Sequence, residues 1–121
     1  MANDDNDSLL IELNSGSDSS KYKAASRLAM NFESTNKDST LFYYNQAIKI
    51  AKKNEWSKYV ANSYFNQGYY FHYNLGEDTS IQFLETAMEW YAKANDSLGV
   101  LNCYYTLGTY WGNFDQLDSA I

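Results

Sequence analysis

The chain has 121 residues, no proline, a formal net charge of −6 and an aromatic content of 17%. So many aromatic residues exclude a disordered linker, and a single cysteine excludes an intrachain disulfide. The negative charge argues against a nucleic-acid-binding role, because phosphate backbones require a basic surface. No stretch of about 18 apolar residues could cross a membrane, and residues 1–7 lack the basic and apolar regions of a signal peptide.

Residues 1–18 form an acidic N-terminal segment with five acids and no base. We expect residues 1–6 to be disordered. Asp7 can cap a short helix that runs to Leu13, because its carboxylate can accept from the first backbone N–H groups. Residues 14–18 (Asn-Ser-Gly-Ser-Asp) have the composition of a linker, so the folded domain is expected to begin at residue 19.

Two helices are predicted in residues 19–54 from apolar side chains spaced three and four residues apart, the period of an α-helix. The first stripe consists of Tyr22, Ala25, Leu28, Ala29 and Phe32. The second consists of Leu41, Tyr44, Ala47, Ile48 and Ala51, in a helix from Asp38 to Lys53. Asp38 is the predicted N-cap of that helix, where its charge also suits the helix dipole.

The same pattern continues through residues 55–121. Three further stripes are Val60, Tyr64, Gln67, Gly68 and Phe71, then Ile81, Leu84, Met88 and Tyr91, then Val100, Tyr104, Leu107, Gly108 and Trp111. Asp78 is the predicted N-cap of the middle helix, which runs to about Ala94. Turn residues Gly112-Asn113-Phe114 are expected to end the last helix, and Asp118 is expected to cap a following one.

An offset of 40 residues aligns these blocks without gaps. Asp38-Ser39-Thr40-Leu41 recurs as Asp78-Thr79-Ser80-Ile81 and as Asp118-Ser119-Ala120-Ile121, and Asn62, Tyr64, Gly68 and Tyr70 recur as Asn102, Tyr104, Gly108 and Tyr110. A glycine inside a helix costs about 1 kcal/mol relative to alanine. Its repetition predicts that the paired helix approaches closely at both Gly68 and Gly108.

The repeated residues resemble the tetratricopeptide repeat family. The first helix of each repeat in that family carries a bulky residue, a leucine, a glycine and an aromatic. The matching residues here are Tyr104, Leu107, Gly108 and Trp111, and in the preceding repeat Tyr64, Gln67, Gly68 and Phe71. The second helix carries a small residue, a larger apolar residue and an alanine, here Thr40, Tyr44 and Ala47, then Ser80, Leu84 and Ala87, with Ala120 beginning a third set.

This resemblance implies an all-α fold of antiparallel helix-pair repeats stacked as a right-handed α-solenoid. About two and a half repeats are expected, near residues 19–54, 55–94 and 95–121, the last of them truncated. The period of 40 differs from the usual 34, and Ala92 stands where the family commonly has a proline. This longer variant is similar to the N-terminal repeat regions of bacterial histidine kinases and transcription regulators.

Residues able to support catalysis are few. His72 is the only histidine and Cys103 the only cysteine, too few for the three or four ligands of a zinc site without distant carboxylates. Cys103 has no basic neighbour to lower its pKa, so we expect an inert buried thiol. No phosphate-binding, dinucleotide or metal motif occurs. We therefore expect no enzymatic activity, no metal and no cofactor.

The candidate site is a concave face lined by the first helix of each repeat. Its predicted residues are Asn62, Phe65, Asn66, Tyr69, His72 and Tyr73 from one helix, and Asn102, Tyr105, Thr106 and Thr109 from the next. The asparagines can pair with the peptide groups of a ligand or bridge neighbouring helices. Tyr44, Tyr64, Tyr91 and Tyr104 are assigned to the core. No base lies between Lys58 and Lys93, so we expect the groove to prefer neutral or basic peptides.

The expected function is a non-catalytic scaffold that binds a protein or peptide, without nucleic-acid or membrane partners in this segment. An alternative is a sensory or regulatory segment of a larger bacterial histidine kinase or transcription regulator. The last helix would keep an unpaired apolar face with Leu101, Tyr104, Leu107 and Trp111, so we expect either that this chain is part of a longer protein or that the face self-associates. One cysteine and no signal segment favour the cytoplasm, although a periplasmic sensor fragment without its leader would have the same features.

Overall fold

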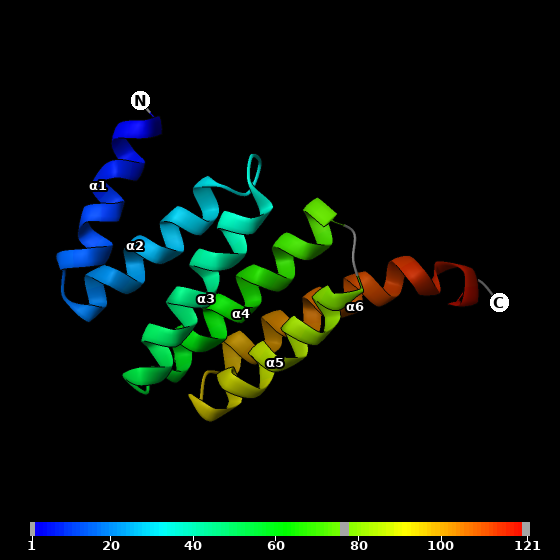
Figure 1. The fold of residues 1–121 in the computed structure, drawn as a ribbon. Helices are drawn as coiled ribbons and strands as arrows, with labels where there is room; N and C mark the ends of the chain where they lie inside the picture. The colour runs from blue at the N-terminus through cyan, green and yellow to red at the C-terminus, as the bar shows by residue number, and fades with distance from the viewer. Residues whose placement is uncertain (1, 76–77, 120–121) are drawn as a thin grey trace.

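The computed structural model describes the backbone of residues 2–75 and 78–119 and the side chains of residues 6–74 and 78–109. These residues form six α-helices and one π-helical turn, with no strand among them: α1 (Ala2–Ser15), α2 (Asp18–Asn31), α3 (Lys37–Lys53), α4 (Ser57–Tyr70), η1 (Phe71–Leu75), α5 (Thr79–Lys93) and α6 (Ser97–Ser119). Each helix packs mainly against its neighbours in sequence, and successive helices reverse direction (Figure 1). The predicted all-α class is confirmed.

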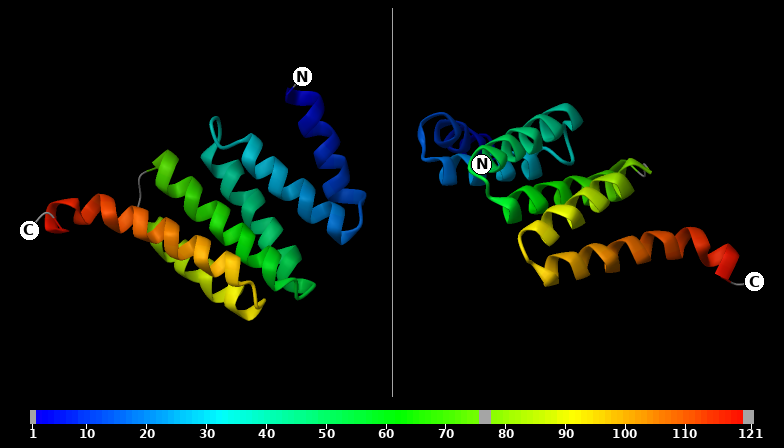
Figure 2. Two further views of the ribbon diagram at one scale, coloured as in Figure 1. Left: turned by 180° about the vertical axis from the view of Figure 1, so that it is seen from behind. Right: turned by 90° about the horizontal axis from the view of Figure 1, so that it is seen from below.

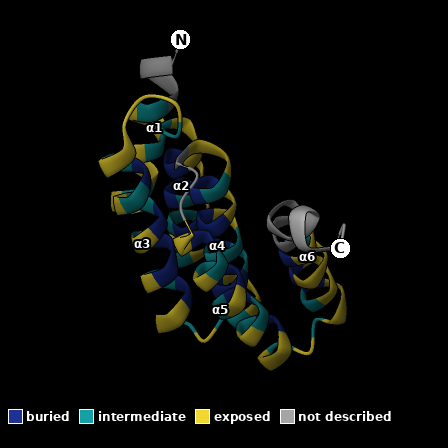
Figure 3. Cartoon of the chain, turned by 90° about the vertical axis from the view of Figure 1, so that its right-hand side faces the viewer, coloured by how far each residue is buried: buried dark blue, intermediate teal, exposed yellow. Residues whose placement is uncertain are grey.

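The helices follow one another across the molecule, with α1 at one edge and α6 at the other (Figure 2). Buried residues lie where consecutive helices face each other (Figure 3). Alanines dominate these contacts: Ala25, Ala47 and Ala51 pack with Tyr22 and Val60, while Ala61 and Ala87 pack with Tyr91 and Cys103. Small side chains let helix backbones approach closely, and the larger rings fill the space between them. The predicted stripes of α2 and α3 are therefore buried, except at their ends.

The α3–α4 and α5–α6 turns have the same backbone geometry, 40 residues apart. Glu55 and Asn95 both have positive φ, at 58° and 56°. The following amides make matching bonds, Trp56 N to Ala51 O and Asp96 N to Tyr91 O, both at 2.9 Å. Such bonds close a helix in the Schellman motif. The 40-residue repeat of the sequence is thus present in the backbone of both turns.

The helix caps differ from the predicted ones. Asn36, not Asp38, caps α3, and its Oδ1 accepts from the backbone N–H of Ser39 at 3.0 Å. The helix begins one residue earlier than predicted, so Asp38 falls in the first turn, where its charge still suits the helix dipole. Asp78 occupies the N-cap position of α5, but its backbone is already helical and its side chain makes no capping bond.

The N-terminal segment is helical from Ala2, so the predicted disorder of residues 1–6 is wrong over residues 2–6. Acidic residues in the first turns of a helix are favoured by its dipole, so the helix begins before Asp7, which lies inside α1 and is not its N-cap. The Asn31 amide donates to Asn6 Oδ1 at 3.0 Å, which joins the start of α1 to the end of α2.

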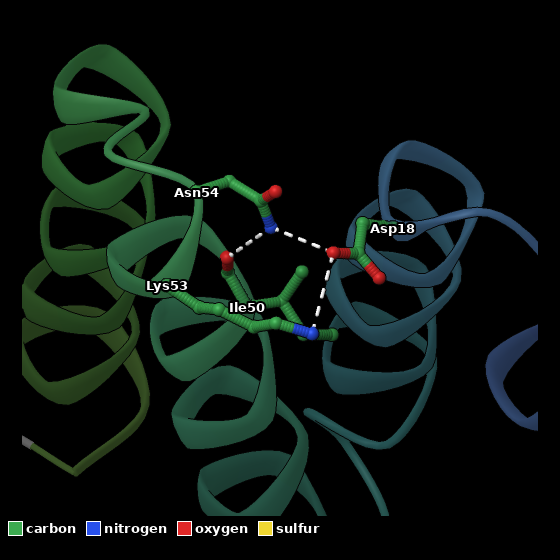
Figure 4. A network of polar contacts seen from close by, with 4 residues as sticks. All are labelled: Asp18, Ile50, Lys53 and Asn54. Atoms are coloured by element: carbon green, nitrogen blue, oxygen red, sulfur yellow. Dashed lines mark hydrogen bonds and ion pairs between the residues drawn. The ribbon is translucent and has the colours of Figure 1, made fainter.

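A polar network joins the start of α2 to the end of α3 (Figure 4). The Asn54 amide donates to Asp18 Oδ2 and to the Ile50 carbonyl, both at 2.9 Å, and Lys53 Nζ lies 3.6 Å from the same Asp18 oxygen. The hydrogen bond from Asn54, aided by the charge of Lys53, lowers the pKa of the Asp18 carboxyl. The ionised Asp18 therefore links the start of α2 to the end of α3, in addition to the buried contacts between the two helices.

Three predictions for the last helix are wrong. α6 continues through Gly112-Asn113-Phe114 to Ser119, so there is no break there and Asp118 caps no new helix. Glycine and asparagine are only mildly unfavourable in a helix, and no described segment packs back on α6 to impose a turn. Tyr104 is 60% exposed rather than part of the core. The buried side of α6 instead carries Cys103 and Leu107, which face α5.

Gly68 and Gly108 lie in different surroundings, although they share a repeat position. A Cβ on Gly68 would lie 3.1 Å from Leu84 Cγ and from the Ser80 carbonyl oxygen, so α5 approaches α4 closely as predicted. A Cβ on Gly108 would meet nothing within 4 Å among the described residues, so the predicted close approach is absent there. The prediction required a helix after α6 that packs against Gly108, and the described residues include no such helix.

Candidate functional site

Two adjoining cavities lie between α2 and α4, with volumes of about 410 and 280 Å³. Met30 of α2 and Phe65 and Asn66 of α4 line both cavities, so the two run side by side along one face. We call this surface the α2–α4 groove. Its remaining lining residues are Tyr22, Lys23, Ser26, Arg27, Tyr59, Asn62 and Tyr91 in the larger cavity, and Glu33, Tyr44, Tyr69, Tyr70 and Asn74 in the smaller.

Tyrosines form the floor of the larger cavity. The Tyr22 ring stacks on Tyr59 with centroids 5.0 Å apart, and its hydroxyl donates to the Tyr59 carbonyl at 3.0 Å. The Tyr91 hydroxyl, from α5, donates to Asn62 Oδ1. Burial raises the pKa of both Tyr22 and Tyr91, so both hydroxyls keep their protons as donors. Both hydroxyls are thus hydrogen-bonded to α4.

Asn62 therefore has a structural role that the sequence left open. Its side-chain oxygen joins α4 to α5 through Tyr91. An asparagine amide also carries an NH₂ donor, which can pair with a peptide carbonyl. Asn66, one turn further along α4, is exposed and lines both cavities. The two amides thus lie on the same wall of the groove at i and i+4.

The opposite wall is cationic at one end. Lys23 and Arg27 lie one turn apart on α2, are exposed, and line the larger cavity. The acid near the other end, Glu33, accepts from the Tyr44 hydroxyl at 2.6 Å. The groove therefore has positive side chains beside its larger cavity and a hydrogen-bonded carboxylate beside its smaller one.

A row of rings continues from the groove along α4 into η1. The ring centroids of Phe65 and Tyr69 lie 5.9 Å apart in a stacked arrangement, and those of Tyr69 and Tyr73 lie 4.5 Å apart. The His72 and Tyr73 rings are edge-to-face, with centroids 4.7 Å apart. Tyr69 and Tyr73 are 44% and 59% exposed. Exposed aromatic rings supply large contact areas at low entropic cost.

The structure brings together part of the predicted site. Asn62, Phe65, Asn66 and Tyr69 line the α2–α4 groove, and His72 and Tyr73 extend its row of rings. Asn102, Tyr105, Thr106 and Thr109 lie on α6 and line neither cavity. Two of these direct their hydroxyls at their own helix, Thr106 Oγ1 to Asn102 O at 2.8 Å and Thr109 Oγ1 to Tyr105 O at 3.0 Å.

The sequence missed the α2 wall of the groove. Ser26 and Glu33 are the repeat equivalents of Asn66 and Tyr73, 40 residues earlier in the chain, so the repeat could have predicted these two residues of the wall. Lys23 and Arg27 correspond to Ser63 and Gln67, which are buried in α4, so the repeat gave no signal for them. Their presence overturns the expectation of a groove without bases.

No protein-family model matches this chain. Comparisons with curated proteins and with solved structures also give no match. The groove is therefore interpreted from its own residues.

The described residues offer little for other chemistry. They contain no group of three or more histidine, cysteine or acidic side chains placed to hold a metal ion. None of the described helices combines the length and apolar character needed to span a bilayer. Cys103 is fully buried, as predicted, and burial raises the pKa of its thiol to about 11.

We expect Cys103 to react with a thiol reagent at pH 8 at least about 100-fold more slowly in the native chain than in the unfolded one. A pKa of about 11 instead of 9 lowers the thiolate fraction by that factor, and burial blocks access further. Alkylation followed by mass spectrometry measures both rates. Equal rates with and without guanidinium chloride would show that the thiol is accessible.

Proposed function

We propose that this chain is a helical-repeat module that binds an extended peptide of another protein along the α2–α4 groove. The order of the helices and the identical turns 40 residues apart support helix pairs stacked as a right-handed α-solenoid of the tetratricopeptide kind. The observation that carries the function is the convergence of cationic, amide and aromatic side chains on two adjoining cavities. The proposed role is non-catalytic.

The groove chemistry suits a peptide with both acidic and apolar residues. Lys23 and Arg27 can pair with a carboxylate, and the amide of Asn66 can pair with the peptide backbone. Met30, Phe65 and Tyr69 offer apolar contact next to these polar groups. This preference replaces the one for neutral or basic peptides, which rested on α4 and α6 alone.

A random-peptide library selected on the full chain tests this function. We expect enriched peptides that contain an acid next to an apolar residue. Arg27→Glu is expected to weaken their binding about tenfold, equivalent to about 1.4 kcal/mol, since it replaces attraction by repulsion. Fluorescence anisotropy with the purified peptides gives the dissociation constants, and binding should weaken with added salt.

Two matched variants control for charge and for side-chain loss. Lys49→Glu on α3 changes the net charge by the same amount as Arg27→Glu but lies outside the groove, in a cavity between α1 and α3. Asn45→Ala on α3 is the counterpart of Asn66→Ala, since both asparagines are exposed. If both members of each pair weaken binding equally, the peptide does not occupy the groove.

A further inference from the structure

The outer side of α6 carries an apolar surface that no described residue covers. Its members, which we call the α6 outer face, are Leu98, Leu101, Tyr104, Tyr105 and Gly108, and the first four are 74%, 61%, 60% and 78% exposed. At 3.6 residues per turn these positions span an arc of roughly 120°. α6 lies at the edge of the array, with α5 on its other side (Figures 2 and 3).

The matching face of α4 is covered by α5. Four of its residues, Ala61, Tyr64, Phe65 and Gly68, are the equivalents of Leu101, Tyr104, Tyr105 and Gly108. Ala61 packs in one cluster with Ala87, the ring centroids of Tyr64 and Phe83 lie 6.1 Å apart, and Gly68 faces Ser80. Phe65 packs against the cluster of Leu84 and Leu107 and also lines the α2–α4 groove. Ala87, Phe83, Ser80 and Leu84 belong to α5, whereas Leu107 belongs to α6. At Ala61, Tyr64 and Gly68, α5 therefore covers positions of α4 whose equivalents on α6 are exposed.

Gly108 indicates how a partner would approach. Glycine inside a helix costs about 1 kcal/mol relative to alanine, and the described residues give no compensating contact at this position. At the equivalent Gly68, the missing Cβ is what lets the Ser80 turn of α5 reach the α4 backbone. Gly108 gives α6 the same capacity for close helix contact.

The chemistry of the face defines its partner. Residues 97–109 contain no charged side chain, so recognition depends on shape and apolar contact. The α5 residues that meet α4 include Ser80, Phe83, Leu84 and Ala87. These are a small residue followed at three, four and seven positions by an aromatic, a leucine and an alanine. A helix with this spacing presents one continuous apolar stripe.

We propose that the α6 outer face binds an amphipathic helix of a partner protein with the α5 pattern, its small residue seated on Gly108. This contact is separate from the α2–α4 groove and does not depend on the function proposed for it. The helix lies against α6 as α5 lies against α4, and it covers Leu101, Tyr104 and Tyr105. The interface continues the existing packing of the array by one more layer.

A labelled peptide of residues 78–94 tests this proposal, with a scrambled peptide of the same composition as control. We expect saturable binding of the first peptide to the full chain in fluorescence anisotropy, and none of the second. Gly108→Leu should weaken binding at least tenfold, because the side chain fills the space that the small residue needs. Thr106→Leu, on the opposite side of α6, should leave binding unchanged.

Thermal unfolding of each variant shows whether a loss of peptide binding reflects a loss of folding. A Cβ at position 108 meets no described atom within 4 Å, so Gly108→Leu should fold as well as the wild-type chain. Binding that Gly108→Leu does not weaken would place the peptide elsewhere and overturn the proposal, as would the absence of saturable binding at millimolar peptide. A wild-type chain that sediments as a dimer while Gly108→Leu is monomeric would also overturn it, since a second copy would then occupy the face.

Discussion

Gly99→Ala is expected to lower the free energy of unfolding by about 2 kcal/mol, within the range for overpacking a core. A Cβ on Gly99 would overlap the Tyr91 ring, with Cε1 at 2.7 Å. Tyr91 cannot move away easily, because it is only 6% exposed and its hydroxyl donates to Asn62. The substitution therefore separates α5 from α6 or breaks the link from α5 to α4. Chemical denaturation gives the difference directly.

Gly108→Ala, on the same helix, is the matched control and has the opposite predicted sign. Its Cβ meets no described atom, so only the helix propensity changes, and stability should rise by up to about 1 kcal/mol. If the two substitutions had equal effects, the close contact between Tyr91 and the α6 backbone would be wrong.

Leu84→Ala should cost about 2–5 kcal/mol, the range for a large-to-small change in a core. Leu84 is fully buried and packs with Leu107 of α6 and Phe65 of α4. It also lies beside Gly68, so one side chain joins three helices. The cavity left by its removal would lie at the centre of the second half of the array. Thermal and chemical unfolding curves measure the loss.

Leu101→Ala removes the same atoms from a side chain that is 61% exposed. Its predicted effect on the isolated chain is within about 0.5 kcal/mol, as for other surface changes. A large loss at Leu101 would mean that the α6 outer face is already covered in solution, by a second copy of the chain.

Hydrophobic spacing and the repeat predicted the helices of this chain well. The stripes containing Tyr22 and Tyr44 are buried, and Gly68 makes its predicted close contact. Helix ends were harder, because neighbouring polar residues such as Asn36 and Asp38 compete for the cap. The start of α1 was predicted too late, at Asp7, because the acids before it also favour a helix N-terminus.

The candidate site was predicted only where it lies on α4. Phe65 and Asn66 follow from helix periodicity, but the opposite wall comes from α2, where Lys23 and Arg27 break the repeat. Tyr104 repeats the identity of Tyr64 and yet is exposed, because burial depends on a neighbouring helix and not on the residue type. Gly99 gave no signal, since its role arises from the position of the Tyr91 ring.

Amide chemical-shift mapping tests the central claim, peptide binding in the α2–α4 groove, most directly. The isotope-labelled full chain is titrated with the tightest peptide from the library selection. The proposed groove predicts the largest shifts in residues 23–30 of α2 and 62–69 of α4. Largest shifts confined to α6, or to the surface between α1 and α3, would contradict it.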